Sequence, residues 1–107
     1  TGLEKMDIQN LRDSAGLKEI LSAHTGELKL ICGHVHRNIA GQFGNKLCQI
    51  APGVSHAVTM DLRIDAPNCL TKEPGSFLLH EIRDGILSHQ ILVDNYDGPF
   101  MFYPDSK

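Results

Sequence analysis

Two histidines separated by one residue stand in the stretch GHVHR, residues 33–37. A neutral imidazole nitrogen binds borderline metals such as zinc, manganese and iron. Two histidines at this spacing in a turn can direct their nitrogens to neighbouring points, which suits a two-metal centre. The same spacing also occurs in solvated turns, because a short motif is a weak signal by itself. His34 and His36 are therefore either half of a metal site or part of a polar turn.

The position of the pair favours the metal site. The histidines follow the apolar run 28–32, which is bounded by glycines and predicts a strand covered on both faces. Cys32, at the end of this run, is then expected to be a buried small side chain. Open sheets of α/β proteins bind ligands at the carboxyl ends of their strands. Gly33 is expected to let the backbone turn sharply there.

A single helix is predicted near the start of the chain. Its apolar positions and its last turn follow the i, i+3, i+4, i+7 spacing, at Leu17, Ile20, Leu21 and His24. Asp13 or Ser14 suits the N-cap, and Gly26 suits the end of the helix. His24 falls where a histidine can interact with the final carbonyls, so we predict a capping role for it rather than a ligand role.

The remainder of the chain predicts short strands. Gly44-Asn45 separates two strand-like runs and predicts a tight hairpin. Residues 56–64 alternate between apolar and polar side chains and predict one half-buried strand. A second hairpin is predicted from residues 76–83 and 86–93, and a two-residue turn at Asp84-Gly85 would place His80 directly opposite His89. Residues 65–75 are predicted as a loop, and the aromatic tail 94–104 is expected to pack across the sheet edge.

Composition excludes several classes of function. The chain has 10 Lys and Arg against 13 Asp and Glu, and no element concentrates the basic residues, so binding to nucleic acid is not expected. No apolar run approaches the roughly 20 residues of a membrane span, and no signal peptide is visible, so we expect a cytoplasmic protein. The cysteines lack the Cys-x-x-Cys spacing and predict free thiols.

The stretch GHVHR after LKLIC, followed by a hairpin and then IAPGVSHAV, resembles the closing part of the calcineurin-like metallophosphoesterases. It is most similar to the bacterial cyclic-nucleotide phosphodiesterase branch, in which Gly-His-x-His is the last metal motif. The opening TGLEKMD and the tail DNYDGPFMF are also similar to pieces of that branch. The resemblance spans nearly the whole chain, but only Gly-His-x-His in it is chemically specific.

The resemblance implies roles for four residues. His34 would bind the second of two divalent metals (Mn, Fe or Zn) and His36 the first, while Arg37 and His56 border the site as substrate-side or supporting residues. The implied substrate is a small phosphoester such as a cyclic nucleotide. In the branch, we associate small hydroxyl residues with the two positions that follow the proline of this loop. Gly53 and Val54 stand there in this chain, which leaves the substrate contact of that loop open.

The earlier motifs of the family are absent from this sequence. No aspartate is followed two places later by histidine, no Gly-Asp pair occurs, and Gly44-Asn45 is followed by lysine. We therefore expect residues 1–107 to be the C-terminal fragment of a single metallophosphoesterase domain. The expected fold is α+β, with one N-terminal helix followed by about six mostly antiparallel short strands. These would form the C-terminal part of an α/β/β/α sandwich.

The fragment interpretation has consequences for the isolated chain. It should be inactive and should bind metal weakly, because two imidazoles are fewer than the roughly three protein ligands per ion of catalytic sites. Uncovered apolar surface should favour self-association. Two alternatives remain, of which one is a non-catalytic β-rich structural or interaction domain. The other is a structural zinc site formed by His34, His36 and a cysteine.

Overall fold

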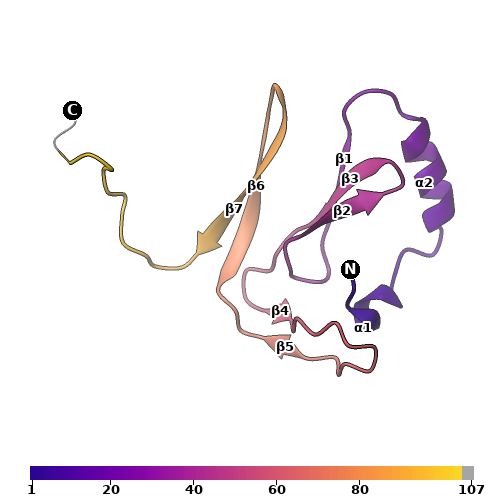
Figure 1. The fold of residues 1–107 in the computed structure, drawn as a ribbon, viewed down its shortest axis with the longest axis horizontal. Helices are drawn as coiled ribbons and strands as arrows, with labels where there is room; N and C mark the ends of the chain where they lie inside the picture. Colours follow the sequence, from indigo (N-terminus) through magenta and orange to yellow (C-terminus); the bar gives the residue numbers. More distant parts are fainter. Residues whose placement is uncertain (105–107) are drawn as a thin grey trace.

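The computed structural model describes residues 1–104, and within them two helices precede seven strands (Figure 1). The elements are α1 (Glu4–Asp7), α2 (Ser14–Ala23), β1 (Lys29–Cys32), β2 (Ile39–Phe43), β3 (Lys46–Ile50), β4 (Ala57–Val58), β5 (Leu70–Thr71), β6 (Gly75–Arg83) and β7 (Gly85–Val93). They form three small sheets, ordered β1-β3-β2, β4-β5 and β6-β7. Only the β1-β3 pair is parallel among these described strands. The predicted α+β class with mostly antiparallel short strands is confirmed.

Helix α2 begins after the predicted N-cap Asp13 and ends at Ala23, three residues before Gly26. The Asp13 carboxylate accepts the Gly16 N–H at 3.4 Å, which satisfies one of the free N–H groups of the first turn. At the other end, His24 leaves the helical conformation while its N–H still bonds to Leu21 O at 3.2 Å. The His24 carbonyl also accepts a hydrogen bond from Lys46 Nζ at 2.8 Å. His24 therefore caps the helix through its main chain and not, as the sequence had predicted, through the histidine side chain.

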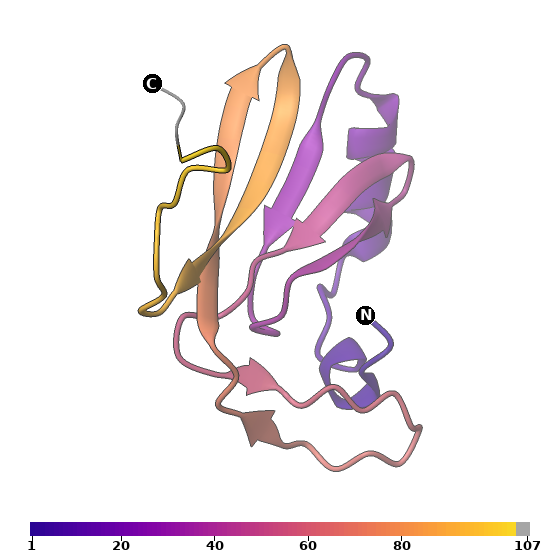
Figure 2. The ribbon, with the colours of Figure 1, turned by 60° about the vertical axis from the view of Figure 1, so that its left-hand side comes forward.

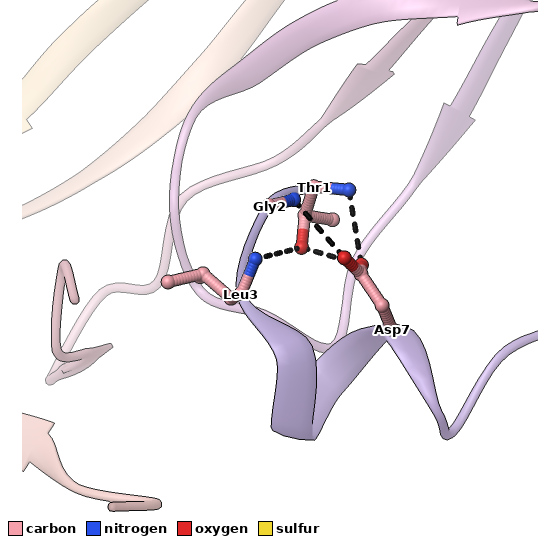
Figure 3. Close-up of polar contacts among 4 residues, drawn as sticks. All are labelled: Thr1, Gly2, Leu3 and Asp7. Atoms are coloured by element: carbon pink, nitrogen blue, oxygen red, sulfur yellow. Dashed lines mark hydrogen bonds and ion pairs between the residues drawn. The ribbon is translucent and has the colours of Figure 1, made fainter. Parts of the chain in front are cut away.

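Helix α1 is a second helix, which the prediction of a single helix missed. It is a single turn that the Asp7 side chain ties back to the start of the chain (Figure 3). The carboxylate accepts hydrogen bonds from the Thr1 hydroxyl at 2.6 Å and from the Gly2 N–H at 3.0 Å, and it pairs with the terminal amino group. The Thr1 hydroxyl contributes most to holding the pKa of Asp7 below its usual range.

The three-stranded sheet contains the first predicted hairpin and one wrong prediction. Strands β2 and β3 turn at Gly44-Asn45 as expected, with Phe43 opposite Lys46 and Gly44 at a φ of +65°. Strand β1 lies at the edge of this sheet, with one hydrogen-bonding side paired to β3 (Figure 2). The expected burial of β1 is wrong, because Ile31 is 45% exposed and Cys32 is exposed.

The predicted strand over residues 56–64 is also wrong. Only Ala57–Val58 forms a strand, β4, which pairs with β5. After Val58, the hydrogen bond from Thr59 N–H to Cys69 O is the last link to a neighbouring segment, and residues 60–64 pair with no strand within the described residues. Alternation of apolar and polar side chains alone cannot stabilise an unpaired strand. The apolar positions of the pattern are consequently exposed, at Met60, Leu62 and Ile64.

The long hairpin β6-β7 forms, but its register differs by one residue from the prediction. Asp84 alone separates the paired residues Arg83 and Gly85, and His80 lies opposite Ser88. His89 pairs instead with Leu79, so the two histidines point to opposite faces and the predicted His80-His89 pair is wrong. Gly85 permits this tighter connection with a φ of +118°.

The expected packing of the tail is wrong as well. Figure 1 shows the segment after β7 running away from the body of the molecule. Its aromatic side chains are mostly exposed, at Tyr96, Phe100, Phe102 and Tyr103. No helix in residues 1–104 is long and apolar enough to cross a membrane.

The small apolar core lies beside residues 33–37, the histidine loop. Leu3 and Met6 of the first helical turn pack against Val35, which stands between the two histidines. Partly buried side chains from β2, β3 and β4 complete the cluster, namely Ile39, Ile50 and Val58. Val35 therefore anchors the histidine loop to the core.

Candidate functional site

The loop that carries the two histidines is anchored by the residue between them. Val35 is 5% exposed, and its carbonyl accepts the Val58 N–H at 3.3 Å. His34 and His36 on either side adopt positive φ angles of 85° and 60°. Such angles are uncommon for residues other than glycine, so the surrounding contacts must hold them. The loop follows β1 directly, as predicted, but the sharp turns fall on the histidines rather than on Gly33.

His36 lies against His56, which comes from the segment before β4. The two ring centroids are 4.5 Å apart, and the ring planes are tilted by 55°. His56 is oriented by Ser55, whose hydroxyl oxygen lies 2.9 Å from its Nδ1. The structure therefore brings together two of the residues that the sequence proposed for the site.

Gly53 makes this approach possible. A Cβ built at Gly53 would lie 2.4 Å from the His56 carbonyl oxygen and 2.8 Å from the His36 Cβ. Glycine is thus the residue type that lets the segment 51–56 lie directly against the histidine loop. The sequence alone marks Gly53 only as a departure from a small hydroxyl residue, and its close contact with the histidine loop becomes visible in the fold.

Arg37 belongs to the wall of the site. Its Nε donates to Val58 O at 2.6 Å, and its guanidinium pairs with Glu73, which also accepts the Thr71 hydroxyl. The Thr71 hydrogen bond, followed by the nearby Arg37 charge, holds the pKa of Glu73 below its usual range. Sequence reasoning missed Glu73, because 36 residues separate it from Arg37 and no motif connects them.

Two recesses meet at the pair His36 and His56. The first has a volume of about 270 Å³ and is lined by residues that include His36, Arg37, Asn38, His56, Glu73 and Gln90. The second, of about 300 Å³, is lined by His34, His36 and His56 together with Gln9 and Cys69. His34 Nε2 lies 3.4 Å from Gln9 Oε1 in this second recess. All four residues predicted for the site thus border one or both recesses.

The donor set fits part of a metal centre. His34 and His36 both line the second recess and offer imidazole nitrogens, a donor type that suits borderline divalent metals. Within residues 1–104, however, no group of three or more His, Cys, Asp or Glu side chains is placed to hold an ion. The alternative of a structural zinc site formed by the two histidines and a cysteine is therefore wrong for this part of the chain.

Comparison with protein-family models found no match. In an alignment of 106 residues that covers 95% of the chain, the sequence is 37% identical to a protein of Arcobacter nitrofigilis named "Probable glycerophosphodiester phosphodiesterase GpdQ". The chain spans 38% of the length of that relative.

Proposed function

We propose that residues 1–107 are the C-terminal part of a single metallophosphoesterase domain in a longer, metal-dependent phosphodiesterase. The observation that carries this proposal is the loop 33–37, which holds two histidines with left-handed backbone angles beside two recesses. The 37% identity to a protein named as a phosphodiesterase supports the same reaction class. The remaining ligands would come from residues outside this chain.

The site residues divide into two groups. His34 and His36 would each supply a nitrogen ligand to a divalent ion, of manganese, iron or zinc. Bound metals of this kind polarise phosphoryl oxygens and lower the pKa of bound water to about 7. His56 has Nδ1 engaged with Ser55, which leaves Nε2 for a substrate oxygen. Arg37 would hold the wall of the first recess, because Val58 and Glu73 occupy its Nε and one terminal nitrogen.

Two classes of phosphodiester are candidates for the substrate. The name of the relative favours a glycerophosphodiester, and the resemblance of the sequence to the cyclic-nucleotide branch favours a cyclic nucleotide. A panel containing a glycerophosphodiester, a cyclic nucleotide and bis(p-nitrophenyl) phosphate, assayed with the full-length protein and added Mn²⁺ or Zn²⁺, distinguishes them.

The variant His36→Ala tests the ligand assignment in the same assays. We expect it to lower turnover by about 100-fold or more, because loss of a ligand disturbs metal occupancy and geometry together. His24→Ala is the matched control, since the exposed His24 contacts Lys46 only through its carbonyl oxygen. Turnover of His36→Ala equal to wild type, with metal added, would refute the assignment.

A non-catalytic interaction domain is the second candidate function. One face of the β6-β7 hairpin exposes apolar side chains, at Phe77, Leu79, Leu87 and Val93. Exposed apolar patches commonly mark protein interfaces, so self-association or a partner protein is the expected role in this case. Full-length protein that purifies without bound metal and sediments as an oligomer at low concentration would favour this function over the phosphodiesterase.

A further inference from the structure

A continuous chain of side-chain hydrogen bonds crosses the molecule and ends at the first recess. Lys29 Nζ donates to Gln49 Oε1 at 2.5 Å, and Gln49 Nε2 donates to Asn38 Oδ1 at 2.7 Å. Asn38 Nδ2 then donates to Gln90 Oε1 at 2.9 Å, and Gln90 Nε2 donates to Ser76 Oγ at 3.1 Å. We call these five residues the amide chain. It joins β1, β3 and Asn38, the residue after the histidine loop, to both strands of the β6-β7 hairpin.

Lys29 gives the amide chain its direction. An ammonium group has donors and no acceptor, so Gln49 must turn its oxygen toward Lys29 and its nitrogen toward Asn38. The same constraint passes from Asn38 to Gln90. Ser76 at the far end does not impose a direction, because a hydroxyl both donates and accepts. The positions of nitrogen and oxygen in all three amides therefore depend on one cation.

The last members of the amide chain face the first recess. Asn38, Gln90 and the buried Ser76 line it together with His36 and His56. Beyond the bonds of the chain, each amide keeps one N–H and one oxygen lone pair. A neighbouring donor and acceptor of this kind match a hydroxyl group, which offers both.

The geometry points to the first recess as a subsite for the hydroxyl-bearing alcohol portion of a phosphodiester. Asn38 and Gln90 determine this specificity, and Lys29 is a positioning residue that orients their amides. This inference rests on the proposed function and deepens it, because it names the residues that select the alcohol group.

The variant Gln49→Glu tests the inference with almost no change in shape. A carboxylate still accepts from Lys29, but it cannot donate to Asn38, which must turn its nitrogen toward residue 49. Gln90 then turns as well, and the Ser76 hydroxyl donates to it. Every bond in the chain is kept while the donor and acceptor positions at the recess are exchanged. Gln42→Glu, at an exposed position of β2, is the control for the added charge.

Activity of the full-length protein is measured on a glycerophosphodiester, which carries free hydroxyls, and on bis(p-nitrophenyl) phosphate, which carries none. Gln49→Glu should lower kcat/KM for the first substrate by about 5- to 30-fold, the effect of one or two mismatched hydrogen bonds, and leave the second within about twofold. Lys29→Met should also lower kcat/KM for the glycerophosphodiester more than for bis(p-nitrophenyl) phosphate. Lys29→Arg, which keeps the cation, should retain the wild-type ratio of the two values. Equal losses on both substrates would show a merely structural role, and no loss on either would overturn the inference.

A binding experiment separates failure of this inference from failure of the proposed function. If the wild-type protein hydrolyses no diester, the side-chain amide signals of Asn38 and Gln90 are followed by NMR while sn-glycerol 3-phosphate or inorganic phosphate is added. Shifts caused by glycerol phosphate alone, and lost in Gln49→Glu, would support the hydroxyl subsite. Equal shifts with inorganic phosphate would assign the recess to phosphoryl oxygens and so overturn the hydroxyl subsite. The absence of any shift would also overturn it.

Discussion

Gly53 is a position at which one added carbon should disturb the site directly. An alanine there would place its Cβ 2.4 Å from the His56 carbonyl oxygen and 2.8 Å from the His36 Cβ. Neither atom is the end of a flexible side chain, so relief requires the segment 51–56 to move away from the histidine loop. Overpacking by one carbon typically costs about 1–3 kcal/mol. We expect Gly53→Ala to lower the free energy of unfolding by about 2 kcal/mol and the Tm by roughly 8–16 °C.

Thermal unfolding followed by circular dichroism measures this effect. Gly41→Ala is the control, because a Cβ at Gly41 in β2 meets no atom within 4 Å and its backbone is not left-handed. The control should melt at or slightly above the wild-type temperature. The ring signals of His36 and His56 in NMR spectra should also shift in Gly53→Ala. Wild-type melting together with unmoved ring signals would refute the close approach.

Three further predictions concern charge, thiols and metal. The lowered pKa of Glu73, due first to Thr71 and then to Arg37, means that its carboxylate stabilises the folded state above its ordinary pKa of 4.5. This contribution is lost as pH falls below that value, so Glu73→Gln should flatten the acid side of the stability profile; an unchanged profile would contradict the contact. Burial, and then the neighbouring Cys32, raises the pKa of Cys48. Alkylation followed by mass spectrometry should therefore modify exposed Cys69 before Cys48, and the reverse order would contradict this environment. Calorimetric titration of the 107-residue chain with Zn²⁺ or Mn²⁺ should show weak binding, and the chain should hydrolyse no diester in activity assays. Tight stoichiometric binding together with turnover would contradict the fragment interpretation.

Features whose cause lies within a few residues could be predicted from the sequence. The N-cap at Asp13 fixes the start of α2, and Gly44-Asn45 fixes the first hairpin. The placement of the histidines in a loop directly after β1 was predicted for the same reason, since an apolar run followed by glycine marks a strand end. The roles of His34 and His36 as ligands remain a prediction.

Features that depend on a partner distant in sequence could not be predicted. The alternation in residues 56–64 indicates which side chains would share a face, but it does not supply a neighbouring strand. The run 28–32 likewise suggested burial that the described residues do not provide. The contact of Arg37 with Glu73 spans 36 residues, and that of Lys29 with Ser88 spans 59. No local pattern encodes either pair.

The register of the β6-β7 hairpin connects these long-range contacts to the candidate site. Side chains at even positions of β7, such as Ser88 and Gln90, share one face of that strand whatever the pairing. Only the observed register places His80 and Ser76 on this same face, where His80 Nδ1 lies 2.8 Å from Ser88 Oγ and Ser76 accepts from Gln90. The predicted register would have joined these residues of β6 to the opposite face of β7. The tight connection around Asp84 therefore completes the amide chain, and a turn lengthened by one residue should separate Ser76 from Gln90 and leave the first recess without its far wall.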